Sequence, residues 1–357
     1  MASPAEPVLT LYGALRGASF DSDSAGLVSD QVMAYIPYDE EWMAIEQSDA
    51  HRAARQLSPT GYVAPPLCLV AFADEAAVGS VHECRIRQGA ALVQYLVDAV
   101  HALRLAKPGW FADPVQVALT FAINAAGWRI ERMPGPFRQL QAGPGDTPLP
   151  PYALSISDLG TASSSGCVHA MGQLVRQYRE LAPNAAVDIA LGEFSRAQGP
   201  SLTPDDRAAM LFTAIDAMFA GMSARRIGRV ALRRFGFRKR VATALLAVGM
   251  EPAAADAEAA WLDWEHGGRG WRNALAHGDP SRQTTAGSRT DLLRLLELVR
   301  ALLPGFVSFA IRWQFERDDL TTGFGLPPNA GLTAAFNIAL ERGEARRVTL
   351  PWLEGPV

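Results

Sequence analysis

Hydrophobic and polar positions follow two different periods along this chain. In the N-terminal part, short apolar runs are separated by loops rich in proline and glycine, which is typical of strands. Further on, apolar residues recur every three or four positions, which is typical of amphipathic helices. The pattern predicts an α+β chain: a mixed α/β domain over 1–160, an all-α helical bundle over 161–320 and a C-terminal tail over 321–357.

The N-terminal part contains four runs of apolar, β-branched and aromatic residues that are predicted as strands. They cover residues 67–72, 115–121, 128–130 and 153–156. One helix is predicted over 89–105, where Leu92 and Leu96 belong to an apolar face and a Lys-Pro-Gly sequence at 107–109 follows as a terminator. The small polar residues of 160–166 are typical of a linker.

From residue 167 onward, almost all of the chain is predicted to be helical. The expected helices cover 168–181, 185–197, a segment starting at 204, 224–248, a segment starting near 253 and one starting at 290. Thr203 is expected to cap the third helix, with Pro204 in its first turn. Pro304 and Gly305 are expected to kink or break the last helix. The tail is expected to add a short helix and a β-like run at 348–350.

Composition and charge narrow the function classes. A chain of 357 residues with 49% hydrophobic residues suits two globular domains, and its net charge of −4 means that any RNA-binding face must be local. The three cysteines are far apart, which favours a reducing compartment. Neither a secretory signal nor a membrane-spanning run is evident, so we expect a cytoplasmic protein that does not associate with a membrane. No Walker-type or dinucleotide-binding loop and no metal-ligand spacing occurs, so we expect neither cofactor nor metal.

The segment around His277 carries the clearest chemistry. Gly278 and Pro280 should end a helix directly after His277. Arg269, Asn273 and His277 are spaced by four, so they can share one helix face.

Arg272 lies beside that face. Trp264, Trp271 and Leu275 fall on a roughly opposite stripe and are expected to face the core, as is Trp261.

Such a set suits RNA cleavage by the 2′-hydroxyl of the RNA itself. That reaction needs a base for the 2′-hydroxyl proton, an acid for the leaving 5′-oxygen and a cation for the charged phosphorane. An imidazole exchanges its proton near neutral pH, and a guanidinium stays charged and can hold phosphate through two hydrogen bonds. The sequence therefore predicts a metal-independent site in which His277 is the acid or base and Arg272 the cation.

These residues resemble a known family. The string Arg-Asn-x-x-x-His-Gly at 272–278 is similar to the Arg-x4-6-His signature of HEPN domains. The segment 211–219 resembles the core helix of that family, with Asp216 as its acid. The order of helices also agrees, and the ApeA-like HEPN group is the variant most similar to this chain. The resemblance covers roughly 167–316, and the N-terminal half resembles no family that we can name.

The resemblance implies both an activity and partners. HEPN domains are helical bundles that commonly form homodimers with two motifs facing one cleft, and they act as ribonucleases in toxin–antitoxin and antiviral systems. Transferred to this chain, Arg272, Asn273 and His277 would be catalytic, with Asp216 and Arg269 in support. The expected partners are RNA, best read as single strands, a second copy of the chain, and an antitoxin or a trigger recognised by the N-terminal domain.

One feature departs from a regular helix. Three of the four residues over 267–270 are glycines, and each glycine within a helix costs about 1 kcal/mol. The helix should therefore either break after His266 and restart at Gly270, or be weak there. An interruption would remove Arg269 from the face of His277, whereas Arg272 and His277 both follow the glycines.

A basic segment precedes this motif. Residues 224–240 contain eight basic residues and no acid. The arginines expected to bind RNA phosphates are Arg225, Arg229, Arg233, Arg234 and Arg238. The alternative is a solvated face, or a set of arginines that pair with acids of neighbouring helices.

Two other functions fit the same residues. The chain could be a non-catalytic HEPN-like module that binds RNA or a nucleotide, or a helical scaffold that binds proteins. At the site itself, the alternative is that His277 only caps the last carbonyl groups and that Arg272 only pairs with an acid.

Overall fold

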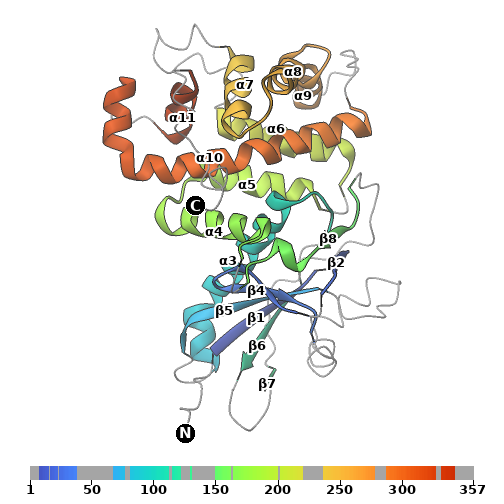
Figure 1. Ribbon diagram of the computed structural model, residues 1–357, viewed down its shortest axis with the longest axis vertical. Coiled ribbons are helices and arrows are strands. Elements are labelled where there is room, and N and C mark those ends of the chain that lie inside the picture. Colours follow the sequence, from blue (N-terminus) through green and yellow to red (C-terminus); the bar gives the residue numbers. More distant parts are fainter. Residues whose placement is uncertain are drawn as a thin grey trace. The chain divides into compact units, whose positions relative to one another are not determined.

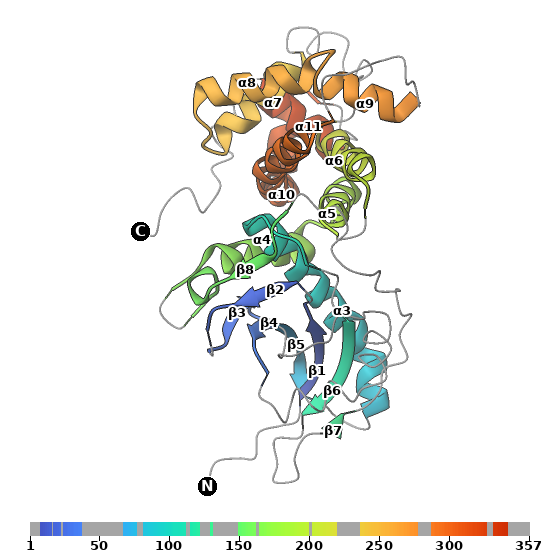
Figure 2. The same ribbon diagram turned by 90° about the vertical axis from the view of Figure 1, so that its right-hand side faces the viewer.

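The computed structural model describes residues 8–15, 17–22, 24–37, 67–76, 81–111, 115–121, 129–130, 149–161, 164–199, 202–219, 236–277, 287–326 and 331–341. Within them the chain is α+β, as its sequence pattern predicts, with strands first and then helices (Figures 1 and 2). The described residues form two compact units. The first contains those up to Gln173 together with Gly199, and the second contains the others.

The first unit is built on a six-stranded sheet in which every neighbouring pair is antiparallel. In spatial order its strands are β3 (Gly26–Ser29), β4 (Val32–Tyr35), β5 (Cys68–Ala76), β1 (Val8–Ala14), β6 (Val115–Phe121) and β7 (Arg129–Ile130). Helix α3 (Val81–Ala106) packs against β1 and β5 (Figure 2). A short parallel pair joins β2 (Ala18–Phe20) to β8 (Tyr152–Leu154).

The central strand β1 was not predicted, nor were β2, β3 and β4. Successive β1 residues such as Leu11 and Tyr12 are buried although they point to opposite faces, so this strand lacks the polar alternation of a half-exposed one. The strands at 67–72 and 115–121 are confirmed as parts of β5 and β6. The predicted helix over 89–105 is confirmed as part of the longer α3.

The segment predicted as a linker, 160–166, makes specific contacts in its described residues. The backbone of Gly160 exchanges hydrogen bonds of 2.7 and 2.9 Å with Leu27, which belongs to the edge strand β3. Gly166 donates to the carbonyl of Leu159 at 3.1 Å, and a Cβ at Gly166 would lie 2.2 Å from the carbonyl carbon of Asp158. Small residues are therefore needed here for close packing of the backbone, and not only for flexibility.

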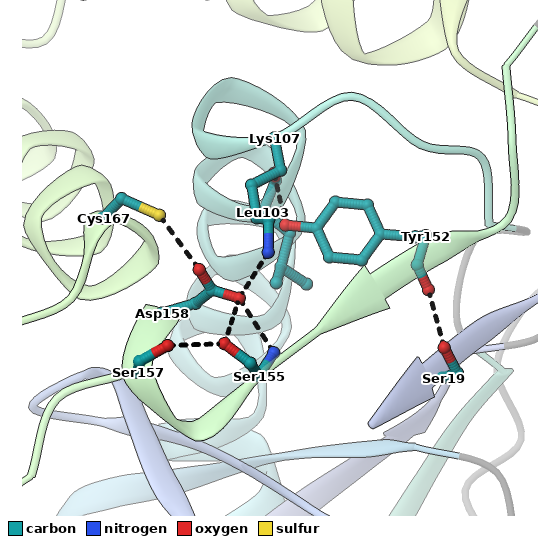
Figure 3. A network of polar contacts seen from close by, with 8 residues as sticks. All are labelled: Ser19, Leu103, Lys107, Tyr152, Ser155, Ser157, Asp158 and Cys167. Atoms are coloured by element: carbon teal, nitrogen blue, oxygen red, sulfur yellow. Dashed lines mark hydrogen bonds and ion pairs between the residues drawn. The ribbon is translucent and has the colours of Figure 1, made fainter. Parts of the chain in front are cut away.

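Asp158, in the short helix η1 (Ile156–Asp158), ties this segment to α3 (Figure 3). Its Oδ2 accepts from Lys107 Nζ at 2.6 Å and from the backbone N and the Oγ of Ser155 at 2.8 and 3.0 Å. Burial by itself would raise the pKa of Asp158, but the hydrogen bonds from Lys107 and Ser155 outweigh it and hold the pKa below its usual value. The carboxylate is thus stabilised in its charged form.

Cys167 is the first residue of α4 (Cys167–Leu181) and lies on the side of Asp158 away from Lys107 (Figure 3). Its Sγ donates to Oδ1 of Asp158 at 3.5 Å. Burial and the negative charge of Asp158 raise the pKa of the Cys167 thiol. The thiol therefore stays protonated at neutral pH and is a poor nucleophile.

The second unit is helical. Its elements are the C-terminal part of α4 (Cys167–Leu181), α5 (Ala185–Ala197), α6 (Pro204–Phe219), α7 (Phe237–Ala247), α8 (Pro252–Asp263), α9 (Gly268–His277), α10 (Arg289–Phe324) and α11 (Leu332–Glu341). The long α10 packs against α5, α6, α7 and α11, and Figure 1 shows it running across the unit. Its leucines and phenylalanines form much of the core.

Several helix boundaries follow from local signals in the sequence. The α5 bounds agree with the predicted 185–197. At the start of α6, Thr203 Oγ1 accepts a hydrogen bond of 3.1 Å from the backbone of Asp206, which confirms the predicted cap. The short helix predicted in the tail is confirmed as α11. The first part of the helix expected over 224–248 and the run at 348–350 lie outside the described residues.

The predicted break at Pro304 and Gly305 is wrong. Helix α10 continues through Pro304, and its one non-helical residue is Glu316, with φ −104° and ψ 15°. A proline inside a helix costs about 3 kcal/mol, but the neighbouring Phe306 and Val307 are fully buried. Burial of this apolar stretch outweighs the lost backbone hydrogen bond. None of the described helices combines the length and apolar character that crossing a membrane would require.

Candidate active site

The candidate site is built from α6 and α9, which pack against each other in the second unit. Trp271 of α9 is only 3% exposed, and its ring meets Phe212 of α6 edge to face at 5.8 Å between ring centres. The next residue on α9 is Arg272, and Asp216 lies one turn beyond Phe212 on α6. The buried aromatic pair therefore sets the distance between the two polar residues that follow it.

The glycines before the motif allow α8 and α9 to meet closely. A Cβ at Gly267 would lie 2.5 Å from the carbonyl oxygen of Trp261, and one at Gly268 would lie 3.0 Å from Leu262. The helix is interrupted, but the break lies after Asp263 and not after His266, and the helix starts again at Gly268 and not at Gly270. Arg269 consequently belongs to α9 and stays in helical register with His277.

Arg272 and Asp216 form an ion pair between the two helices. Arg272 donates from Nε at 3.2 Å and from Nη2 to the same carboxylate oxygen, Oδ2. Nη1 takes no part in this contact. The other carboxylate oxygen, Oδ1, is buried and accepts no hydrogen bond within the part of the chain that the structure describes. Asp216 thus holds the guanidinium by one edge, and among the described residues no hydrogen bond occupies the opposite edge.

The remaining motif residues lie along α9. Asn273 is half-buried, and His277 is exposed at the last residue of the helix. At 1.5 Å per residue, Arg272 and His277 are about 7.5 Å apart along the helix axis. Arg269, in the first turn, lies 3.6 Å from Asp263 of α8. The site therefore offers an oriented cation, an amide and an accessible imidazole within the last six residues of the ten-residue α9.

Trp264 lies elsewhere than predicted. It was expected in the core with Trp261 and Trp271, which are buried, but it is 51% exposed. The predicted stripe required one continuous helix from Trp264 to Leu275. Trp264 instead ends α8 with an extended backbone (φ −76°, ψ 139°), which turns its side chain out of the helical pattern. Leu275 is half-buried.

The predicted RNA-binding arginines are described only in part. Arg225, Arg229, Arg233 and Arg234 lie outside the described residues. Arg238, in the first turn of α7, is exposed and pairs with Asp256 of α8 at 2.8 Å. The alternative interpretation of the basic segment, in which arginines pair with acids of a neighbouring helix, thus holds for Arg238.

Among the described residues, no group of three or more His, Cys, Asp or Glu is arranged to hold a metal ion. No protein-family model, curated protein or solved structure matches this chain.

Proposed function

We propose that this chain is a metal-independent endoribonuclease of the HEPN type and that α9 supplies its reacting groups. The observation that carries the proposal is the contact between Arg272 and Asp216. It orients a guanidinium by its Nε edge, five residues before the exposed imidazole of His277. An oriented cation and an accessible acid–base group, here about 7.5 Å apart along the axis of one helix, are what phosphoryl chemistry requires from a protein.

In the proposed reaction, the 2′-oxygen of a ribose attacks the adjacent phosphorus and the bond from phosphorus to the 5′-oxygen breaks. A base accepts the 2′-hydroxyl proton and an acid gives a proton to the leaving 5′-oxygen. His277 serves in one of these roles. Arg272 binds the phosphorane oxygens through its free edge. The products are a 2′,3′-cyclic phosphate and a 5′-hydroxyl, and no water is consumed.

Other residues have supporting roles in this proposal. Asn273 orients the phosphate or His277, Asp216 positions Arg272, and Arg269 adds positive charge at the start of α9. By the resemblance to HEPN domains, two copies of the chain would face one cleft, and the protein would act in the cytoplasm as a toxin or in antiviral defence. An antitoxin or a trigger bound by the N-terminal part would then control it.

A non-catalytic RNA- or nucleotide-binding module is the second candidate, and one observation favours it. Arg272 is already neutralised by Asp216, whose two oxygens are largely turned toward protein. An arginine so paired contributes less net charge to a phosphorane than a free one. In this alternative, α9 would bind RNA phosphates and the RNA would not be cleaved. The remaining alternative, a helical scaffold that binds only proteins, would bind no RNA.

The proposal is tested by incubating a mixed RNA pool with the full-length protein in excess EDTA. The native chain should cut the pool and leave 2′,3′-cyclic phosphates. His277→Ala should lower the cleavage rate by about 100-fold or more, the usual contribution of a general acid or base. The matched control is His169→Gln, which removes an imidazole from α4, where it bonds to Ser165 and Gln173.

The outcomes of the cleavage assay distinguish the proposed nuclease from its alternatives. Equal cleavage by the native chain and the His277→Ala variant would show that α9 is not the site. Binding of RNA by the native chain without cleavage would favour the non-catalytic module. An equal loss in the His169→Gln variant would show that the effect comes from general destabilisation, which thermal melting of each variant monitors independently.

A further inference from the structure

Trp264 is an exposed indole beside the candidate site. Of the five tryptophans among the described residues, Trp261, Trp271 and Trp313 are buried and Trp110 is half-buried, whereas Trp264 is 51% exposed. Its ring contacts His266 edge to face, at 5.6 Å between ring centres and an angle of 81°. This contact restricts the ring without covering it.

The position of Trp264 connects it to α9. It follows Asp263, whose carboxylate lies 3.6 Å from Arg269 in the first turn of α9. The exposed indole and this guanidinium are thus held on two adjoining helix ends. Arg272 and His277 follow on the same α9, within about 15 Å of its start along the axis.

We infer that Trp264 is a stacking platform for a base of single-stranded RNA and that Arg269 holds a phosphate of the same strand. The inference rests on the proposed function, because it makes α9 the track along which the strand reaches Arg272 and His277. An aromatic face next to a cation is the usual arrangement for binding single strands without base specificity. A base inside a duplex is already stacked and cannot use such a platform.

The charges around Trp264 agree with this division of roles. Trp264 has an acidic residue on each side in the sequence: Asp263 precedes it, and the exposed Glu265 follows it in the turn. Carboxylates repel phosphates but do not prevent stacking of an uncharged base. Nearby phosphates are therefore directed to Arg269, on the α9 side of the turn, while the indole takes the base.

The test measures RNA binding by the full-length chain carrying His277→Ala, so that the probe is not cut. A fluorescein-labelled single-stranded RNA of mixed sequence is titrated and its anisotropy recorded. Adding Trp264→Ala should weaken binding about tenfold, whereas Trp264→Phe should retain most of the affinity.

In the chain that keeps His277, Trp264→Ala should raise the KM for RNA cleavage and leave kcat nearly unchanged. A duplex of the same sequence should bind equally to the proteins with and without Trp264.

Phe315→Ala is the matched control, because Phe315 is 67% exposed and belongs to the same unit. Phe315 is also far from α9. The start of α10 is near the site, because Gly287, just before α10, lies beside Trp271 of α9. Phe315 follows that start by 26 residues, or about 39 Å along the helix. Its removal should leave RNA affinity unchanged. The Trp264 variants should also keep the native melting temperature, since the side chain is exposed.

The outcomes separate this inference from the proposed function. If the His277→Ala chain binds RNA equally well with and without Trp264, the stacking role is wrong while the nuclease proposal stands. If that chain binds no RNA at all, both are wrong. If Trp264→Ala changes the molecular mass in solution from dimer to monomer, the indole is a contact between subunits and the stacking role is overturned.

Discussion

At the scale of single residues, the ion pair between Asp216 and Arg272 is the contact by which α6 orients a side chain of the candidate site. Both side chains are partly buried, 31% and 24% exposed, and one carboxylate oxygen receives two donors of the guanidinium. A lysine at 272 would keep the positive charge but lose this forked contact. The pair therefore determines where the cation points, in addition to its charge.

Asp216→Asn is expected to weaken this contact without changing the shape of the side chain. Because a partly buried ion pair contributes about 1 kcal/mol, the free energy of unfolding should fall by about that amount. Cleavage should slow because Arg272 is no longer fixed by a carboxylate. Chemical denaturation of Asp216→Asn, Arg272→Gln and the double variant measures the coupling. Strictly additive effects would show that the two residues do not act together.

At the scale of elements, α7 and α11 are joined by a buried polar contact. Arg240 Nη1 donates to Asn337 Oδ1 at 2.7 Å, and both residues are buried. Asn337 in turn donates to the carbonyl of Thr333 at 2.6 Å, and Thr333 donates to the carbonyl of Ala217 in α6 at 3.1 Å. The C-terminal helix is thus connected to two others by polar groups as well as by its apolar face.

Asn337→Ala should destabilise the second unit by about 2 kcal/mol, because it leaves the buried guanidinium of Arg240 without its amide acceptor. Urea denaturation gives the change. Glu341 is also buried and interacts with the charge of Arg240, so a complete apolar replacement must include it. The triple variant Arg240→Met, Asn337→Leu and Glu341→Leu replaces all three polar groups and should be less destabilised than Asn337→Ala alone. A triple variant at least as unstable as the single one would mean that packing volume, and not the lost hydrogen bond, causes the effect.

At the scale of the whole molecule, polar contacts within each unit join described segments that lie far apart in the sequence. In the first unit, Asp158 connects the end of α3, through Lys107, to the start of α4, through Cys167 (Figure 3). Hydrogen bonds hold the pKa of Asp158 below its usual value, against the effect of burial. Its stabilising contribution is therefore complete above the pKa of about 3.9 of an unfolded aspartate and is lost as the pH falls through the folded-state pKa.

Asp158→Asn should consequently lower the stability of the native fold at neutral pH by about 1–2 kcal/mol, the value of hydrogen bonds to a charged group. The difference from the native chain should shrink as the pH falls below about 4, where the unfolded carboxyl becomes protonated, and should vanish once the pH has passed the lower folded-state pKa. Thermal melting of both proteins at neutral and acidic pH measures this. An equal difference at both pH values would mean that the charge of Asp158 contributes nothing.

The sequence by itself determined the features that depend on neighbouring residues. The change from strand to helix periodicity, the bounds of α5 and the Thr203 cap of α6 all rest on interactions within a few positions. The spacing of Arg269, Asn273 and His277 on one helix is of the same kind. Capping and side-chain period act locally, so they can be read without knowing the fold.

Only the tertiary structure decided the rest. The central strand β1, the continuity of α10 through Pro304 and the exposure of Trp264 each depend on which distant residues cover a segment. Asp216 and Arg272 are 56 positions apart, and their contact exists because Phe212 and Trp271 pack α6 against α9. Burial is a property of the assembled chain, so these features cannot follow from local pattern alone.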